Sequence, residues 1–285
     1  MMAFHTLIDG LKGFNVAALQ IALRRPARVR GYISYCMRKF DEIMGRGLPA
    51  RDPIAFINGD SGSSSSSAAE IVLPLTADAD GSISMSELCI LALVTKVLKP
   101  KAVFEFGTYK GRTTSMFILN VDHGASVTSL DLPQEAGLSE AQRREYIDTD
   151  AALVEHRHPA EFIYRLHLDT RCQLLACSSL DFDPSPYAGT IELGFIDGAH
   201  ALPFVQNDTR KMATMMASRG LVFWHDYGGK GRFQPLAGYL EQLSQRIPIY
   251  RISGTSLAWT SADHLRRAFN LITDPEVRVA ELRVG

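Results

Sequence analysis

The sequence predicts an α/β protein whose doubly wound, largely parallel sheet ends in an antiparallel hairpin. Two observations lead to this prediction. From about residue 100 onwards, short β-rich runs alternate with helical segments, and parallel strands need crossover connections of that kind. Near the end, two strand-like runs flank Ser253-Gly254-Thr255, a glycine-containing turn that is typical of a hairpin.

Composition and size are those of an ordinary globular protein. The 285 residues are enough for one large α/β domain with an appendage, or for two small domains, and 46% are hydrophobic and 21% charged. A net charge of −1 argues against nucleic acid as a partner. The longest apolar run, Leu88–Leu98, is too short for the roughly 20 residues of a membrane-spanning helix. Without a secretory signal at Met1–Gly10 and without CxxC spacing among the four cysteines, we expect a soluble cytoplasmic protein with reduced thiols.

Residues 1–57 are predicted to form a helical N-terminal extension, because apolar residues recur in them at spacings of three to four. Its middle carries a group of basic side chains: Arg24, Arg25, Arg28, Arg30, Arg38 and Lys39. Two interpretations stay open. The basic face could contact an anionic membrane surface or an acidic substrate, or it could be a solvated face or a contact between copies in a homo-oligomer. Residues 58–68, rich in Ser and Gly, are predicted to be a linker or loop.

Residues 69–262 are predicted to form the main domain, followed by a C-terminal helix and tail over 263–285. Ser84 or Ser86 could cap a first helix that runs from about Glu87 to Leu98, where Pro100 ends it. Strands are expected at Ala102–Phe106, Ser126–Leu130, Gln173–Cys177, Glu192–Ile196 and Leu221–Trp224, with helices at Thr113–Leu119 and Leu202–Ala217 among them. The hairpin strands are expected at Ile247–Ile252 and Ser256–Thr260.

A glycine-containing turn follows the first predicted strand, in Glu105-Phe-Gly107-Thr108-Tyr-Lys-Gly111-Arg-Thr113. Glycines let the backbone approach a ligand, and the helix that follows supplies free N–H groups. Glu105 stands where the dinucleotide fingerprint GxGxxG has its first glycine. A carboxylate there would repel a pyrophosphate but suits the ammonium or sulfonium group of S-adenosylmethionine (SAM). The alternative is a tight strand–helix turn that binds no ligand.

A second acid, Asp131, ends the next strand, where it could accept both ribose hydroxyls of an adenosine. Ser178 and Ser179 follow the third strand and could reach the adenine ring, although serines after a strand are also common turn formers. The predicted SAM site comprises Glu105, Gly107, Thr108, Gly111, Thr113, Asp131, Ser178 and Ser179.

Acids and histidines follow the fourth and fifth strands, in Phe-Ile-Asp197-Gly-Ala-His200 and His225-Asp226-Tyr227. Ligands bind outside the carboxyl ends of strands in such sheets, so these side chains should converge beside the SAM site. Asp197, His225 and Asp226 form an oxygen and nitrogen set that suits Mg²⁺ or Mn²⁺ more than zinc. Such an ion would hold and acidify a substrate hydroxyl, and His200 could remove its proton, with Asp197 also counted as catalytic. The alternative is that the aspartates cap helices and the histidines are structural.

Together these motifs resemble the class I SAM-dependent methyltransferases that act on small molecules, in particular the macrolide and sugar O-methyltransferases and the cephalosporin-hydroxylase-type proteins. The resemblance covers roughly residues 85–260 and includes the strand Gly254-Thr-Ser-Leu-Ala-Trp259. It implies a seven-stranded sheet with an antiparallel last strand, Asp197 and Asp226 as metal ligands, and His200 as general base. Where metal-binding relatives often have an acid, this chain has His225. Imidazole favours softer metals, and a metal-free mechanism is an alternative.

The resemblance implies O-methylation of a small-molecule hydroxyl, with a sugar, a polyketide or a phenolic compound as the acceptor. Two alternatives come from other classes. One is a nucleotide-dependent oxidoreductase on the same kind of sheet, against which Glu105 argues. The other is a non-catalytic, methyltransferase-like interaction protein that uses its basic N-terminal helices for docking.

Overall fold

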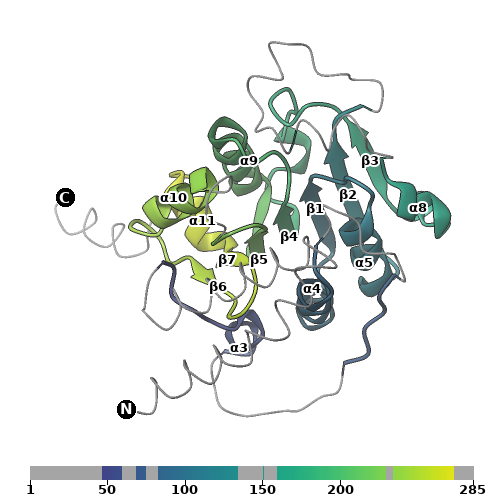
Figure 1. The fold of residues 1–285 in the computed structure, drawn as a ribbon, viewed down its shortest axis with the longest axis horizontal. Helices are drawn as coiled ribbons and strands as arrows, with labels where there is room; N and C mark the ends of the chain where they lie inside the picture. Colours follow the sequence, from purple (N-terminus) through teal and green to yellow (C-terminus); the bar gives the residue numbers. More distant parts are fainter. Residues whose placement is uncertain are drawn as a thin grey trace, which may run out of the picture. The chain divides into compact units, whose positions relative to one another are not determined.

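One sheet of seven strands organises the structure, in the order β3-β2-β1-β4-β5-β7-β6. Figure 1 shows this order from right to left. The strands are β1 (Ala102–Phe106), β2 (Ser126–Asp131), β3 (Gln173–Ala176), β4 (Ile191–Ile196), β5 (Met216–Trp224), β6 (Tyr250–Arg251) and β7 (Ala258–Ser261). β1 to β5 run parallel, and β7 is antiparallel to both β5 and β6. The predicted fold class, including the antiparallel hairpin, is confirmed.

This computed structural model describes residues 47–59, 69–74, 83–133, 150, 159–228 and 234–272, all within a unit that spans residues 47–285. The predictions for residues 1–46, for most of the linker and for residues 273–285 lie outside the described residues. The domain boundaries drawn from the sequence therefore stay predictions.

Helices cover both faces of the sheet. They are α3 (Pro53–Ile57), α4 (Met85–Leu98), α5 (Arg112–Asn120), α8 (Glu161–Arg165), α9 (Leu202–Met215), α10 (Gln234–Leu243) and α11 (Ala262–Ala268). Short 3₁₀ helices lie at Asp169–Arg171 and Ser185–Tyr187. One apolar cluster joins the sheet to α9, α10 and α11, and a second joins it to α4, α5 and α8.

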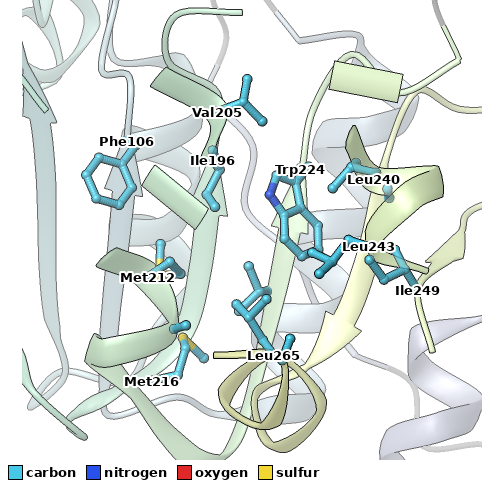
Figure 2. Close-up of a cluster of buried hydrophobic side chains, with 14 of the residues drawn as sticks. Phe106, Ile196, Val205, Met212, Met216, Trp224, Leu240, Leu243, Ile249 and Leu265 are labelled. Carbon is cyan, nitrogen blue, oxygen red and sulfur yellow. The ribbon is translucent and has the colours of Figure 1, made fainter. Parts of the chain in front are cut away.

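Alternation along the strands assigns side chains to the two faces. Val103 of β1 belongs to the cluster with α4 and α5, whereas Phe104 and Phe106 belong to the cluster with α9. Figure 2 shows Trp224 of β5 in the latter cluster among Ile196, Leu240 and Leu243. The indole Nε1 of Trp224 donates to Oγ1 of Thr209 at 3.0 Å, so its polar atom is satisfied inside the core.

Local chemistry explains where several elements begin. Ser84, not Ser86, is the N-cap of α4, and it forms a capping box with Glu87. Helix α9 ends at Met215 and β5 begins at once with Met216, which pairs with Ile191, so the predicted helix end at Ala217 and strand start at Leu221 were wrong. β7 starts later than predicted, at Ala258, because the Ser256 N–H donates to Glu87 instead of to the sheet.

The stretch before α3 is anchored on the sheet. Arg251 of β6 pairs with Ala50, and the indole of Trp259 donates to the Arg51 carbonyl at 3.0 Å. The Leu48 N–H donates to the Tyr227 hydroxyl at 2.7 Å, which ties this stretch to the residue after Asp226.

Within the described part of the chain, no helix is long and apolar enough to cross a membrane. The three described cysteines, Cys89, Cys172 and Cys177, are free and partly buried, while Cys36 lies outside the described residues.

Candidate active site

The predicted site residues follow the carboxyl ends of neighbouring parallel strands. Gly107 comes after β1, Asp131 ends β2, Asp197 follows β4, and His225 and Asp226 follow β5. Because β2, β1, β4 and β5 are adjacent in the sheet, all four sequence motifs meet along one edge.

The turn after β1 is packed against the end of β4. Gly107 has φ +97°, and a Cβ there would lie 2.1 Å from the Asp197 carbonyl oxygen. Its N–H donates to the Leu130 carbonyl at 2.8 Å, and the Asp197 N–H donates to the Phe106 carbonyl at 2.8 Å. Gly107 therefore allows a close approach between two segments of this chain, in addition to any approach to a ligand.

Replacing Gly107 with alanine should destabilise the protein by roughly 2–4 kcal/mol, because the new Cβ combines an unfavourable φ with a clash against backbone. Urea denaturation measures this loss. Gly124→Ala is the matched control, since a Cβ at Gly124 meets nothing within 4 Å. Equal midpoints for the two variants would contradict the packing described for Gly107.

Glu105 lies in the interior and takes part in a hydrogen-bond network. Only 1% of its surface is exposed, and one carboxylate oxygen accepts from the Thr114 hydroxyl and, at 2.7 Å, from the Ser129 hydroxyl. Ser129 also shares a 2.7 Å hydrogen bond with Thr108. Burial raises the pKa of Glu105 to about 8, despite these hydrogen bonds. Through these hydrogen bonds, the Glu105 side chain links β1 to β2 and α5 beside the turn.

Glu105→Gln should make stability less dependent on pH. The raised pKa means that the folded state holds the proton more tightly than the unfolded chain, whose carboxyl has an ordinary pKa of 4.5. The stabilisation is complete below pH 4.5 and is lost as the pH rises towards 8. Glutamine stays neutral, so the variant should gain on the order of a few kcal/mol over wild type between about pH 5 and pH 8. Urea denaturation of both proteins at the two ends of this pH range measures the gain. A difference in stability between variant and wild type that is the same at both pH values would contradict the prediction.

Asp131 holds the turn after β1. Its two carboxylate oxygens accept from the Tyr109 N–H at 2.6 Å and from the Leu132 N–H at 2.7 Å. Tyr109 has φ +48°, a left-handed conformation that is uncommon outside glycine and directs its N–H at this carboxylate. The acid at the end of β2 therefore fixes the loop that precedes α5.

The remaining predicted cofactor residues lie after β3 and at the start of α5. The Ser178 hydroxyl accepts from the Leu180 N–H at 3.2 Å, which is the bonding of a turn former. The Ser179 carbonyl accepts from Asn207 and Lys211 of α9. Gly111 is the N-cap of α5 and Thr113 is buried in its first turn.

Two aspartates and two histidines come together after β4 and β5. Nδ1 of His225 lies 3.1 Å from Oδ1 of Asp197 and 3.4 Å from Oδ2 of Asp226, and Nε2 of His200 lies 3.0 Å from the same Asp226 oxygen. Ligand atoms of Asp197, His225 and Asp226 all lie within 4.8 Å of one another, as a shared metal ion would require. The convergence expected of these four side chains is found.

Two further acids that the sequence did not indicate complete the cluster. Asp150 accepts from the His200 N–H at 2.7 Å, and its other oxygen lies 3.0 Å from Nδ1 of His200. Glu87 of α4 lies 3.5 Å from Nε2 of His225. Each histidine is therefore held between carboxylates on both ring nitrogens.

The carboxylates determine the charge of the histidines. Burial favours neutral His200, but hydrogen bonds and charge from Asp150 and Asp226 outweigh it and raise its pKa to about 10. Burial likewise opposes protonation of His225, yet Asp197 and Asp226 raise its pKa well above the ordinary value. The carboxylates of this cluster are therefore stabilised by positive charge close to them, which protonated histidines or a bound cation could supply.

One family model matches part of the chain. Residues 104–227 match the model described as a methyltransferase domain. No curated protein matches the chain. Solved structures with a similar fold include three methyltransferases. A methyltransferase from Podospora anserina bound to S-adenosylhomocysteine (SAH) is 13% identical, with 81% of this chain and 94% of that chain covered and a TM-score of 0.47. An O-methyltransferase from Bacillus cereus in complex with SAH is 14% identical (coverage 75% and 92%, TM-score 0.45), and the O-methyltransferase TomG from Streptomyces achromogenes in complex with SAM is 12% identical (coverage 64% and 82%, TM-score 0.45).

Proposed function

Since residues 104–227 match a methyltransferase domain on a sheet of this order, we propose that this chain is a class I SAM-dependent methyltransferase that methylates a hydroxyl group of a small molecule with the help of a divalent cation. The observation that carries the proposal is the position of the acid–histidine cluster. It follows β4 and β5, and its Asp197 backbone packs directly on the turn after β1. A site for a methyl donor and a site for an acceptor hydroxyl would then adjoin.

The donor would lie along the edge formed by the ends of β1, β2 and β3. SAM would supply the methyl group there. Asp131, at the end of β2, is the proposed acceptor for the ribose hydroxyls, and the turn from Gly107 to Gly111 would face the amino-acid part. Thr108, Thr113, Ser178 and Ser179 are proposed to line the same site. For Glu105 we propose an indirect role, because its buried carboxylate supports this turn from behind.

The cation would be held by Asp197, His225 and Asp226, whose donor atoms are two carboxylate oxygens and one imidazole nitrogen. This donor set fits a divalent metal such as Mg²⁺ or Mn²⁺. A bound cation would polarise and orient the acceptor hydroxyl and lower its pKa. The cluster's demand for positive charge supports this assignment.

His200 is the proposed general base. Its Nε2 lies beside Asp226, on the acceptor side of the cluster, and Asp150 holds its Nδ1 and its backbone N–H. With Asp226 engaged as a metal ligand, its carboxylate would no longer support the extra proton on His200. The pKa of the imidazole would then fall towards the range in which it can accept the hydroxyl proton. Sugars, polyketides and phenolic compounds all carry hydroxyls that such a site could use.

Calorimetric titration with SAH tests the donor site, and SAH release from SAM in the presence of a panel of phenols, sugars and polyketides tests the reaction. We expect micromolar SAH binding, and turnover that falls after treatment with EDTA and returns with MnCl₂ or MgCl₂. No binding at millimolar SAH would refute the proposal. Turnover that EDTA does not change would support methyl transfer but rule out a role for the cation in it.

A further inference from the structure

Glu87 connects the site to a helix that no sequence motif of the site includes. It lies in the first turn of α4, 138 positions before His225 in the chain. Nε2 of His225 faces its Oε2 at 3.5 Å, while Nδ1 of the same ring faces Oδ1 of Asp197 at 3.1 Å. The imidazole therefore bridges Glu87 on one side and the proposed metal ligands on the other.

Four hydrogen bonds fix the Glu87 carboxylate. Oε1 accepts from the Ser256 N–H at 2.6 Å and from the Ser256 hydroxyl at 2.7 Å. Oε2 accepts from the Ser84 N–H at 3.2 Å and from the Ser84 hydroxyl at 2.5 Å. Glu87 is only 5% exposed and His225 only 8%, so neither side chain has room to turn away from the other. The fixed orientation of the carboxylate is transmitted to the ring.

This arrangement selects the nitrogen that His225 offers to the site. With a cation bound between Asp197 and Asp226, the Nδ1 lone pair would face the cation, and the ring proton would lie on Nε2, where the Glu87 carboxylate can accept it. A lone pair between two carboxylates is stable only with a cation among them. Metal-bound histidines commonly donate their second N–H to a carboxylate, which orients the ring and makes it a stronger ligand.

We propose that Glu87 is a positioning residue that presents Nδ1 of His225 to the metal site, and that the resulting nitrogen ligand makes the site prefer Co²⁺ or Mn²⁺ over Mg²⁺. The inference rests on the metal site of the proposed function. Its chemical basis is that imidazole suits transition metals, whereas Mg²⁺ prefers oxygen ligands and octahedral coordination with several waters.

Titration of the full-length protein with CoCl₂, followed by calorimetry and by the visible absorption of the bound ion, tests the role of Glu87. In Glu87→Gln the side-chain amide can donate to Nε2, which shifts the ring proton to Nδ1. We expect Co²⁺ affinity to fall about 10- to 100-fold, with a change in the visible spectrum. Ser86→Ala is the matched control, because Ser86 is exposed in the same turn of α4 and its hydroxyl faces Ser84 instead of Glu87. Its Co²⁺ affinity should match that of wild type.

The preference among metals is tested by His225→Asn, which offers an amide oxygen in place of Nδ1 to the site. Wild type should bind Co²⁺ about tenfold or more tightly than Mg²⁺, and His225→Asn should lose most of that preference. This comparison stays informative if Glu87→Gln fails to fold. Unchanged Co²⁺ affinity in folded Glu87→Gln, or equal affinities for Co²⁺ and Mg²⁺ in wild type, would overturn the inference. Binding of SAH without binding of any of these metals would overturn it too, while leaving methyl transfer intact.

Discussion

Replacing His200 with alanine is expected to lower kcat for methyl transfer by about 10²- to 10⁴-fold, the usual contribution of a general base. The imidazole is held on both nitrogens, by Asp150 and by Asp226, so a water molecule that fills its place would not reproduce its orientation or its basicity. The measurement is the rate of SAH formation at saturating SAM, with an acceptor taken from the panel of hydroxyl compounds.

The affinity for SAH should stay unchanged in His200→Ala, because this residue is assigned to the acceptor side. His123→Ala provides a control, since His123 is exposed in the turn between α5 and β2. A variant without His200 that keeps the wild-type kcat would show that the imidazole is structural.

Removal of the Asp131 carboxylate should raise the Kd of SAH by at least about 100-fold. Hydrogen bonds to a charged group contribute about 1.5–3 kcal/mol each, and two ribose hydroxyls would lose such a partner. The Tyr109 N–H also loses its acceptor, so the left-handed turn that precedes α5 loses support. Calorimetric titration of Asp131→Ala with SAH measures the effect.

Adenosine gives a sharper version of this experiment, because it keeps the ribose and lacks the amino acid. Its affinity for Asp131→Ala should fall by a similar factor if the lost contacts are to the ribose. Asp122→Ala, which changes an exposed acid in the turn before β2, is the control. Equal SAH affinities in the two variants would contradict the assignment of Asp131.

The fold could be predicted from the sequence because each of its signals is local. The bounds of β1 agree with prediction to the residue, since an apolar run there is bordered by Pro100 and Gly107. Contacts with distant residues caused the errors. Met216 pairs with Ile191 and so begins β5 early, and the Ser256 N–H bonds to Glu87 and so delays β7. Helix α10, which the sequence did not single out, packs apolar residues such as Leu240 on the sheet.

The site was predicted in part for the same reason. Asp197, His200, His225 and Asp226 were found because they follow strands, and parallel strands end at a common edge. Asp150 and Glu87 reach the histidines from elsewhere, and nothing in their sequence neighbours marks this role. The only signal near Glu87 is its spacing from Ser84, which predicts a helix cap and does not reveal its second partner, His225.

The order of the strands has a consequence for how the protein is made. β7 lies between β5 and β6, so the outer edge of β5 has no neighbour until residues 258–261 have been synthesised. Glu87 likewise lacks the Ser256 donor for one of its carboxylate oxygens until that residue, 169 positions later, has been synthesised. Such long-range pairing forms slowly, and a bare strand edge invites association with other chains. A nascent chain that stalls before residue 256 therefore carries the site residues but lacks both β7 beside β5 and the Ser256 partner of Glu87.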